Sequence, residues 1–245
     1  MKHQALIFFI CLASLSCKEQ VKKEISTANQ KPLIDKNISD PIERENTLFA
    51  FVGEKIEVSE IPVSEGAMDF GFKAKYKVLL KVYGNLSNDT IEFIGYDHYG
   101  FPRFAKFKNV LLFVSNDSGK LYHEKYMFND VYKTMDGRWA GPYSISDYNH
   151  PYIEAIDIKP EIIEFKEQVS YPIKGIRQEY IKLRYPEPYY TIIDSSAVAI
   201  YGNFLEDLFL LKKRTVLTAR GLFSGKEEIE KRLQEHDSLG TKTNN

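Results

Sequence analysis

The polar residues best placed for chemistry in this chain are Asp97 and His98, which lie between two glycines in residues 95–100. A loop at this point would present a carboxylate beside an imidazole, and such a pair can act as general acid and base. A metal site would need further ligands, and neither His123 nor His150 stands at a spacing that would complete one. We therefore expect no metal site. We interpret the pair as a surface turn whose two side chains are candidate binding residues, and an acid/base role is the alternative.

Two other polar groups lack the context that their chemistry requires. Asp194-Ser195-Ser196 has no Gly-x-Ser-x-Gly turn and no histidine tied to it, so a nucleophilic serine is not predicted. The basic run Lys212-Lys213-Arg214 is short and falls inside a helical pattern, which is typical of a solvated helix face. No glycine-rich strand-to-helix loop is available to hold a phosphate. The sequence therefore predicts no catalytic residues and no cofactor.

Aromatic side chains are the second kind of candidate. The chain has 16 Tyr, 16 Phe and one Trp. Several of them lie in Pro- and Gly-rich stretches outside regular alternation: Trp139, Tyr143, Tyr148, Tyr152, Tyr185, Tyr189 and Tyr190. Aromatic residues on loops are enriched at binding sites for proteins and can stack on sugar rings. We expect the first four to contribute to a binding surface, and the alternative is half-burial between loops and the folded body.

Cys17 ends an N-terminal segment with the pattern of a secretion signal. A lysine follows Met1, residues 5–16 are apolar or small, and this stretch is shorter than the roughly 20 residues that span a bilayer. The segment resembles the signal of bacterial lipoproteins, whose lipobox ends in a small residue before the lipidated cysteine. Ser14 and Leu15 depart from the common lipobox because they look interchanged. An ordinary signal cut near Ser16 is the alternative.

The resemblance implies that residues 1–16 are removed as a signal peptide and that Cys17 carries a lipid. The chain has two cysteines, and Cys11 would leave with the signal, so Cys17 would have no disulfide partner. The expected location is the bacterial cell envelope, with the protein attached to a membrane by its lipid and facing the periplasm or the cell surface. No later run of 18 apolar residues exists, and we expect the remainder to be soluble.

Composition limits the partners. The formal net charge of −1 provides no basic face for nucleic acid. Residues 17–47 combine the predicted lipidation site with charged and polar residues and scattered aliphatic ones, which is linker composition. A flexible chain of this length reaches about 30 Å, so it would hold the folded body clear of the membrane.

The clearest periodicity runs from Phe70 to Val82, where apolar residues alternate with lysines. This period of two predicts a long strand with one buried face. Further strands are predicted at residues 48–52 and 55–58, with Gly53 as a bulge, and at 90–94, 110–114 and 121–122. Five short strands separated by turns predict a small barrel or sandwich over residues 48–135.

Four stretches of this region, residues 51–54, 76–84, 90–94 and 108–113, resemble the netrin-like module. This module is the OB-type barrel of tissue inhibitors of metalloproteinases and related secreted proteins. The resemblance implies that fold and the binding of other macromolecules. The inhibitors chelate zinc through an N-terminal cysteine and are braced by disulfides, and this chain has no counterpart of either. Inhibition is therefore not implied.

The C-terminal half is expected to add a β-rich extension and helices, which makes the fold α+β and mainly β. Alternating segments at residues 153–158, 162–171 and 180–185 predict further strands within an extension over 136–223. Apolar residues at helical spacing predict a docked helix over 204–220, with Asn203 as its N-cap and Glu206 completing a capping box. Residues 224–245 are expected to form a polar helix and a tail.

Two functions fit these observations. The first is a membrane-anchored bacterial lipoprotein that acts as a binding module for a protein or glycan in the cell envelope. The second is an envelope hydrolase that uses an acid/base pair near Asp97 and His98. The missing catalytic motif favours the first, and a purely structural envelope protein is a third possibility. The sequence leaves the ligand and the membrane open.

Overall fold

The computed structural model describes residues 47–227 and 230–231. The predicted signal peptide, Cys17, the linker up to residue 46 and the C-terminal tail lie outside these residues. The described part of the chain is mainly β with additional helices, as the sequence predicts. None of its helices combines the length and apolarity needed to cross a membrane.

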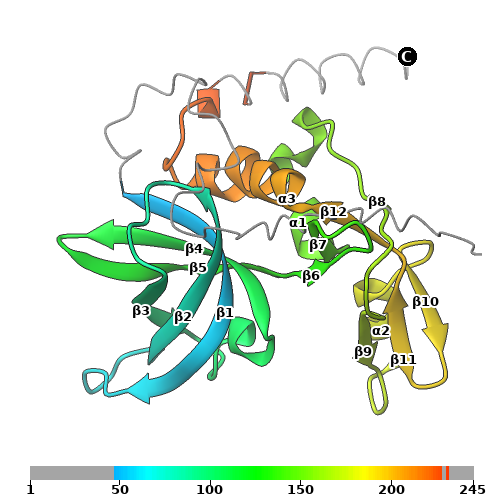
Figure 1. Cartoon of the computed structure of the whole chain (residues 1–245), viewed down its shortest axis with the longest axis horizontal. Coiled ribbons are helices and arrows are strands. Elements are labelled where there is room, and N and C mark those ends of the chain that lie inside the picture. The colour runs from blue at the N-terminus through cyan, green and yellow to red at the C-terminus, as the bar shows by residue number, and fades with distance from the viewer. Residues whose placement is uncertain (1–46, 228–229, 232–245) are drawn as a thin grey trace, which may run out of the picture. The chain divides into compact units, whose positions relative to one another are not determined.

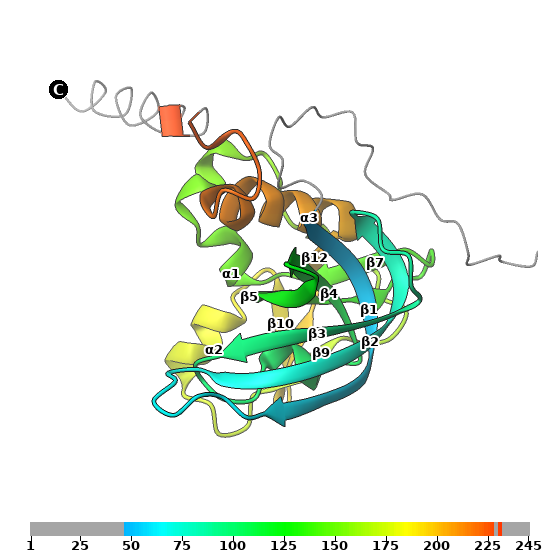
Figure 2. The ribbon, with the colours of Figure 1, turned by 90° about the vertical axis from the view of Figure 1, so that its left-hand side faces the viewer.

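Five strands form a closed barrel in the order β1-β2-β3-β5-β4 (Figure 1). They are β1 (Leu48–Ile61), β2 (Phe70–Tyr83), β3 (Thr90–Asp97), β4 (Asn109–Asp117) and β5 (Lys120–Asp130). The neighbours are antiparallel except β3 and β5, which run parallel through Ile94 and Tyr122. Figure 2 shows β1, β2 and β3 curving together around the barrel. A short 3₁₀ helix, η3 (Arg103–Lys106), connects β3 to β4.

Side-chain alternation explains how β2 builds the barrel interior. Phe72, Ala74 and Tyr76 are buried, while Lys73 between them and Lys77 after them are exposed. The predicted bulge at Gly53 is confirmed, because the register between β1 and β2 shifts there. A methyl group on Gly53 would approach a ring carbon of Tyr76 to 3.0 Å. Glycine therefore lets β1 bend against the buried tyrosine.

Strand β4 is buried on both faces, which explains its unbroken apolar run. Val110, Leu112 and Val114 line the barrel interior. Leu111 and Phe113 point to the other side, where they pack against a helix. A strand covered on both faces needs no polar alternation.

That helix is α3 (Leu205–Lys212), which continues as a π-helical turn, η5 (Lys213–Leu217). Its Phe209 is fully buried, with ring centroids 5.2 Å from Tyr83 and 6.2 Å from Phe113. Leu205 and Leu208 join the same cluster. The predicted helix is thus confirmed, and its apolar side closes over the outer face of β1 and β4.

The predicted N-cap of this helix is wrong. The residue at the cap is Phe204, and no side-chain hydrogen bond caps the helix. Asn203 instead belongs to a strand and is 1% exposed. Its side-chain amide donates to the carbonyl of Lys159 at 3.1 Å and accepts from the Tyr148 hydroxyl at 2.7 Å. Strand pairing turns this side chain into the interior, away from the helix terminus.

The remaining strands form two small sheets. One has the order β6-β7-β12-β8, with β6 (Tyr132–Lys133), β7 (Trp139–Pro142), β8 (Glu161–Ile162) and β12 (Tyr201–Phe204). The other has the order β10-β11-β9, with β9 (Ser170–Pro172), β10 (Tyr190–Ile193) and β11 (Ser196–Ala199). Three short helices accompany them: α1 (Ile145–Tyr148), η4 (Pro151–Ala155) and α2 (Gln178–Arg184).

The three alternating segments predicted in this region are corrected by the structure. Residues 153–155 belong to η4, residues 180–184 to α2, and residues 162–171 hold only the ends of two short strands. In α2 the buried Ile181 accepts a hydrogen bond from the amide of Tyr185, four residues later, at 2.8 Å. The first and third segments have six residues, which is too short for alternation to distinguish a strand from a helical turn.

Buried polar contacts join the barrel to this extension. The carboxylate of Asp130, at the end of β5, accepts hydrogen bonds from the hydroxyls of Tyr132, at 2.9 Å, and of Tyr171. Burial raises the pKa of Asp130, and the two tyrosine hydrogen bonds oppose that rise. The contact with Tyr171 spans 41 residues of sequence, so it ties β9 to the barrel.

A buried ion pair forms a second joint. Lys212 donates to Asp147, and the other carboxylate oxygen of Asp147 accepts from the Asn129 amide at 2.7 Å. The side chains of Lys212 and Asp147 are 7% and 2% exposed. The expected solvated face of residues 212–214 is therefore wrong for Lys212, although Arg214 is exposed. Lys212, the last residue of α3, points into the interior because its ammonium pairs there with the carboxylate of Asp147 on α1.

Candidate functional site

Exposed aromatic side chains gather at the end of the barrel where β2 begins and β3 ends. We call this surface the aromatic end. It consists of six exposed residues: Met68, Phe70, Tyr96, Tyr99, Phe101 and Tyr126. Tyr99 and Met68 are the most exposed, at 86% and 80%. Strand pairing brings Phe70 opposite Asp97, and the rings of Tyr99 and Tyr126 lie 6.1 Å apart, so three separate segments contribute to one surface.

The turn after β3 places Tyr99 on the surface. Asp97 is 8% exposed, and its carboxylate accepts a hydrogen bond from the backbone amide of Tyr99 at 2.8 Å. Such a bond to the amide two residues later stabilises a tight turn. Gly100 follows with φ +97°, a conformation that other residues rarely adopt. Asp97 therefore acts as a turn residue whose bond directs the next side chains outward.

A bulge in β5 places Tyr126 beside this turn. Between the pairs Leu112–Phe128 and Val114–His123, β4 advances by two residues while β5 advances by five. The additional residues of β5 leave the ladder, and Tyr126 adopts φ +66°. A non-glycine residue in this region costs about 1–3 kcal/mol and persists only where its surroundings hold it. Arg220 supplies part of that support, because its guanidinium donates to the carbonyl of Lys125 at 2.8 Å.

The centre of the aromatic end is polar and charge-compensated. Lys125 donates to both carboxylate oxygens of Asp69, at 2.8 and 2.7 Å. The hydrogen bond to Asp69 raises the pKa of Lys125, and burial opposes this rise. His98 Nδ1 lies 2.9 Å from the carbonyl oxygen of Met68 and 3.6 Å from Asp69 Oδ1. The lysine ammonium also lies 5.2 Å from the Tyr126 ring, so its charge is shared between a carboxylate and an aromatic face.

Asp97 and His98 both lie at the aromatic end, but their side chains have different hydrogen-bond partners. Asp97 holds the turn, while His98 contacts the β1–β2 loop. Within residues 47–227, no hydrogen bond or ion pair joins their two side chains. An acid/base pair would require such a bond or a shared substrate position.

The four aromatic residues predicted for the binding surface lie largely inside the protein. Tyr143 and Tyr152 are each 8% exposed. Tyr143 stacks on Tyr189 at 3.9 Å and on Tyr148 at 5.4 Å, and the Tyr152 hydroxyl donates to Glu230 at 2.8 Å. Trp139 is half-buried against the cluster beneath α3. These side chains therefore have structural contacts, and the exposed aromatic residues lie elsewhere.

Part of the aromatic end has a signal in the sequence. Tyr96, Tyr99 and Phe101 surround the glycine-bounded loop of Asp97 and His98, and aromatic residues in such a loop could have been selected. Phe70 could not, because its position in the β2 alternation assigns it to the buried face. The exposure of Tyr126 depends on the bulge in β5, and no local sequence pattern predicts that bulge.

Among the described residues, no group of three or more His, Cys, Asp or Glu side chains is arranged to hold a metal ion. His123, one of the histidines considered as a ligand, lies inside the barrel. Its Nε2 is 2.9 Å from the carbonyl oxygen of Met127, and its ring centroid is 4.6 Å from that of Phe104. The ring thus packs as a core residue.

His123 should make the stability of the protein depend on pH. Burial lowers its pKa to about 4, and the hydrogen bond to Met127 only partly opposes this. In the unfolded chain the histidine has a pKa near 6.5, so between that pH and about pH 4 it is protonated when unfolded and neutral when folded. The contribution of about 3 kcal/mol is fully present above pH 6.5 and is lost as pH falls towards 4. Urea unfolding across this range should show a shallower loss for His123→Gln than for the parent; identical slopes would contradict the assignment.

Comparison of the chain with protein-family models, with curated proteins and with solved structures found no match. Its function is therefore inferred from its own residues and contacts.

Proposed function

We propose that this chain is a lipid-anchored binding module of the bacterial cell envelope that holds a protein partner on its aromatic end. The observation that carries the proposal is the gathering of six exposed aromatic and methionine side chains on three segments of the barrel. Monomeric proteins rarely expose contiguous apolar surface without a binding role.

The proposed anchor is a lipid on Cys17, which the N-terminal signal pattern and the lone cysteine support. Residues 18–46 would act as the spacer between membrane and barrel. Labelling cells with an alkyne fatty acid should mark the parent chain and leave Cys17→Ala unmarked. Equal labelling of both chains would refute the anchor and leave the binding surface to be tested separately.

We also propose that the barrel is an OB-type barrel of the netrin-like kind. Five strands in a closed barrel support this assignment. The four stretches that carry the sequence resemblance fall on β1, on β2 and its following turn, on β3, and at the start of β4. The barrel has no cysteine in this region, so its stability comes from packing.

A protein partner suits the chemistry of the aromatic end. Tyr, Phe and Met are enriched in the buried centres of protein interfaces, while charged residues are depleted there unless paired. Lys125 and Asp69 satisfy each other before any partner arrives, so a partner would not have to neutralise an isolated charge. The exposed Tyr99 would supply a large, rigid contact area with few rotatable bonds.

Photo-crosslinking in cells tests the proposal. The cross-linking amino acid p-benzoylphenylalanine replaces Tyr99 in one strain and the comparably placed surface residue Ile193, which is 49% exposed, in a second. A discrete protein adduct is expected from position 99 and none from position 193. Equal adducts from both positions, or an adduct with a second copy of this chain, would contradict a specific envelope partner.

Binding of the purified cross-linked protein then measures the contribution of single residues. Truncating a central aromatic contact costs about 2 kcal/mol, or about 30-fold in Kd. Tyr99→Ala should show this loss. Tyr126→Asn should show a loss without unfolding, because asparagine tolerates a positive φ. Ile193→Ala is the matched control and should bind like the parent, whereas unchanged Kd in Tyr99→Ala would overturn the proposal.

A further inference from the structure

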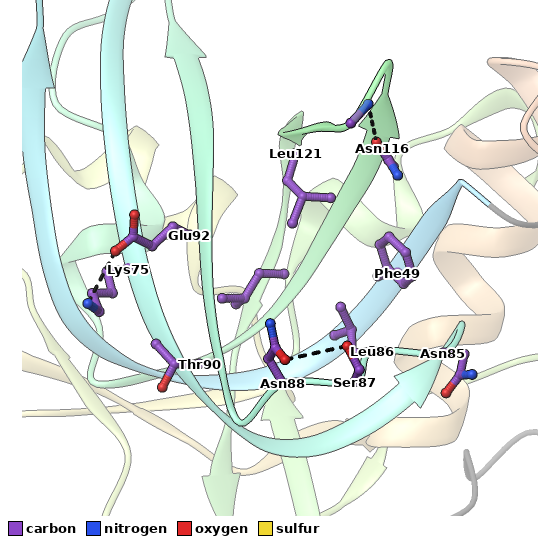
Figure 3. Close-up of a pocket in the computed structure, with 12 residues that line it drawn as sticks. Phe49, Lys75, Asn85, Leu86, Ser87, Asn88, Thr90, Glu92, Asn116 and Leu121 are labelled. Atoms are coloured by element: carbon purple, nitrogen blue, oxygen red, sulfur yellow. Dashed lines mark hydrogen bonds and ion pairs between the residues drawn. The ribbon is translucent and has the colours of Figure 1, made fainter.

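A hollow with a volume of about 540 Å³ lies at the other end of the barrel, between the β2–β3 loop and the β4–β5 hairpin. We call it the polar groove. It differs from the aromatic end in its lining, because amides and hydroxyls predominate on its rim. Figure 3 shows these side chains around the hollow, with Phe49 on β1 and Leu121 on β5 beside them.

The rim offers hydrogen-bond donors and acceptors from side chains that carry no charge. Asn85, Ser87, Asn88 and Thr90 follow one another at the β2–β3 connection, and Asn116 faces them from β4. An amide side chain can donate two hydrogen bonds and accept two. The side-chain oxygen Oδ1 of Asn116 accepts a hydrogen bond from the backbone amide of Gly119 at 3.0 Å, which stabilises the β4–β5 hairpin. Among the described residues, no hydrogen bond uses the amide nitrogens of Asn88 and Asn116.

The charged side chains of the groove compensate each other. Glu92 pairs with Lys75 at 3.2 Å and with Lys73 at 2.8 Å. The hydrogen bonds from Lys73 and Lys75 lower the pKa of Glu92, so the carboxylate stays ionised at neutral pH. A phosphate or sulfate ligand would meet this carboxylate, and a cationic ligand would compete with two lysines. The groove therefore favours a ligand without charge.

The floor of the groove is apolar. Leu86 and Ile91 are buried there, and Phe49 and Leu121 are half-buried against the barrel interior. A ligand that fits needs an apolar face above the floor and many hydroxyl groups towards the rim. Sugar rings combine the two, because their C–H faces pack on aromatic and aliphatic side chains while their hydroxyls both donate and accept.

We propose that the polar groove binds a neutral oligosaccharide. This site is separate from the aromatic end, which lies at the opposite strand ends and is proposed to hold a protein. A protein with both sites would join a glycan to an envelope protein, but each binding event stands on its own residues.

Calorimetric titration of the purified full chain tests the site, in a detergent whose head group is not a sugar. The probes are the neutral cellotetraose, maltotetraose and chitotetraose, with a sulfated tetrasaccharide for comparison. At least one neutral probe should bind, and the sulfated one should bind at least tenfold more weakly. Failure of all three neutral probes, or equal binding of the sulfated one, would overturn the proposal.

Variants locate the binding within the chain. Replacing Asn85 and Asn88 together by Ala removes two amide groups and should weaken binding about tenfold. Asn149→Ala removes an exposed asparagine outside the groove and should bind like the parent. Tyr99→Ala should also leave sugar binding unchanged, which separates this site from the proposed protein surface. Unchanged affinity in the Asn85/Asn88 variant with retained circular dichroism would refute the assignment.

Discussion

Replacing Lys212 by Met should lower the free energy of unfolding by about 3–5 kcal/mol, because it leaves the carboxylate of Asp147 buried without a counter-charge. Asp147 is 4% exposed and lies where α1, α3 and the end of β5 meet. Its remaining partner, the amide of Asn129, carries no charge. Methionine fills the space of the lysine stem, so the expected loss comes from the unpaired charge and not from a cavity.

Two further variants separate charge from packing. Adding Asp147→Asn to Lys212→Met removes the buried charge and keeps an acceptor for Asn129, so the double variant should recover most of the loss. Lys108→Met breaks the exposed pair with Glu54, in which the lysine is 78% exposed, and should change stability little. Urea unfolding followed by circular dichroism measures all three. If Lys212→Met were as stable as the double variant, another group would have to compensate the charge of Asp147.

Phe209→Ala should cost about 3–5 kcal/mol, the usual range for truncating a fully buried phenylalanine. The ring is 0% exposed and contacts aromatic rings of Tyr83, Phe113 and Phe223. These contacts join α3 to the barrel and to the segment after the helix, so the cavity cannot collapse without moving the helix. The transition midpoint in urea and the melting temperature should both fall.

Phe101→Ala is the matched control for this prediction. Phe101 is 53% exposed, and its ring centroid lies 5.5 Å from that of the buried Phe72. We expect a small change in stability together with weaker binding of the proposed partner, whereas a purely structural residue would lower stability without taking part in binding. Equal destabilisation by the two substitutions would contradict the assignment of Phe209 to the core and Phe101 to the surface.

The two structural predictions also bear on the aromatic end. Arg220 follows η5, and its guanidinium pairs with Glu124 at 2.9 Å and donates to the carbonyl of Lys125. The helix that Phe209 and Lys212 hold in place therefore supports the bulge that presents Tyr126. Loosening α3 should weaken partner binding indirectly, and the Tyr126→Asn variant distinguishes this effect from the loss of the side chain itself.

Local patterns predicted much of the barrel. The lysine alternation of residues 73–77 identified β2, and the glycine at position 53 marked the shift in β1. The helical spacing after Phe204 identified α3. These features depend on the period of side chains along one segment, and that period is readable wherever one face is buried. The strands predicted at 153–158 and 180–185 are wrong because six residues are too few to distinguish a strand period from a helical one.

The exposed surface required the tertiary structure. Trp139, Tyr143, Tyr148 and Tyr152 stand in loop-like sequence, yet three-dimensional packing buries or half-buries them. Tyr126 stands in a strand, yet the additional residues of β5 lift it out. Exposure depends on which distant segments cover a residue, and the composition of its own segment does not contain that information.

The sequence by itself determined that the chain is rich in strands, that its charge is balanced, and that its two cysteines, Cys11 and Cys17, both lie in the first 17 residues. Only the tertiary structure decided that Lys212 meets Asp147, 65 residues away, and that Tyr99 and Tyr126 share one surface. The physical reason is the range of the interactions. Alternation and capping act within a few residues, while charge pairing and solvent exposure are determined by neighbours that folding brings together.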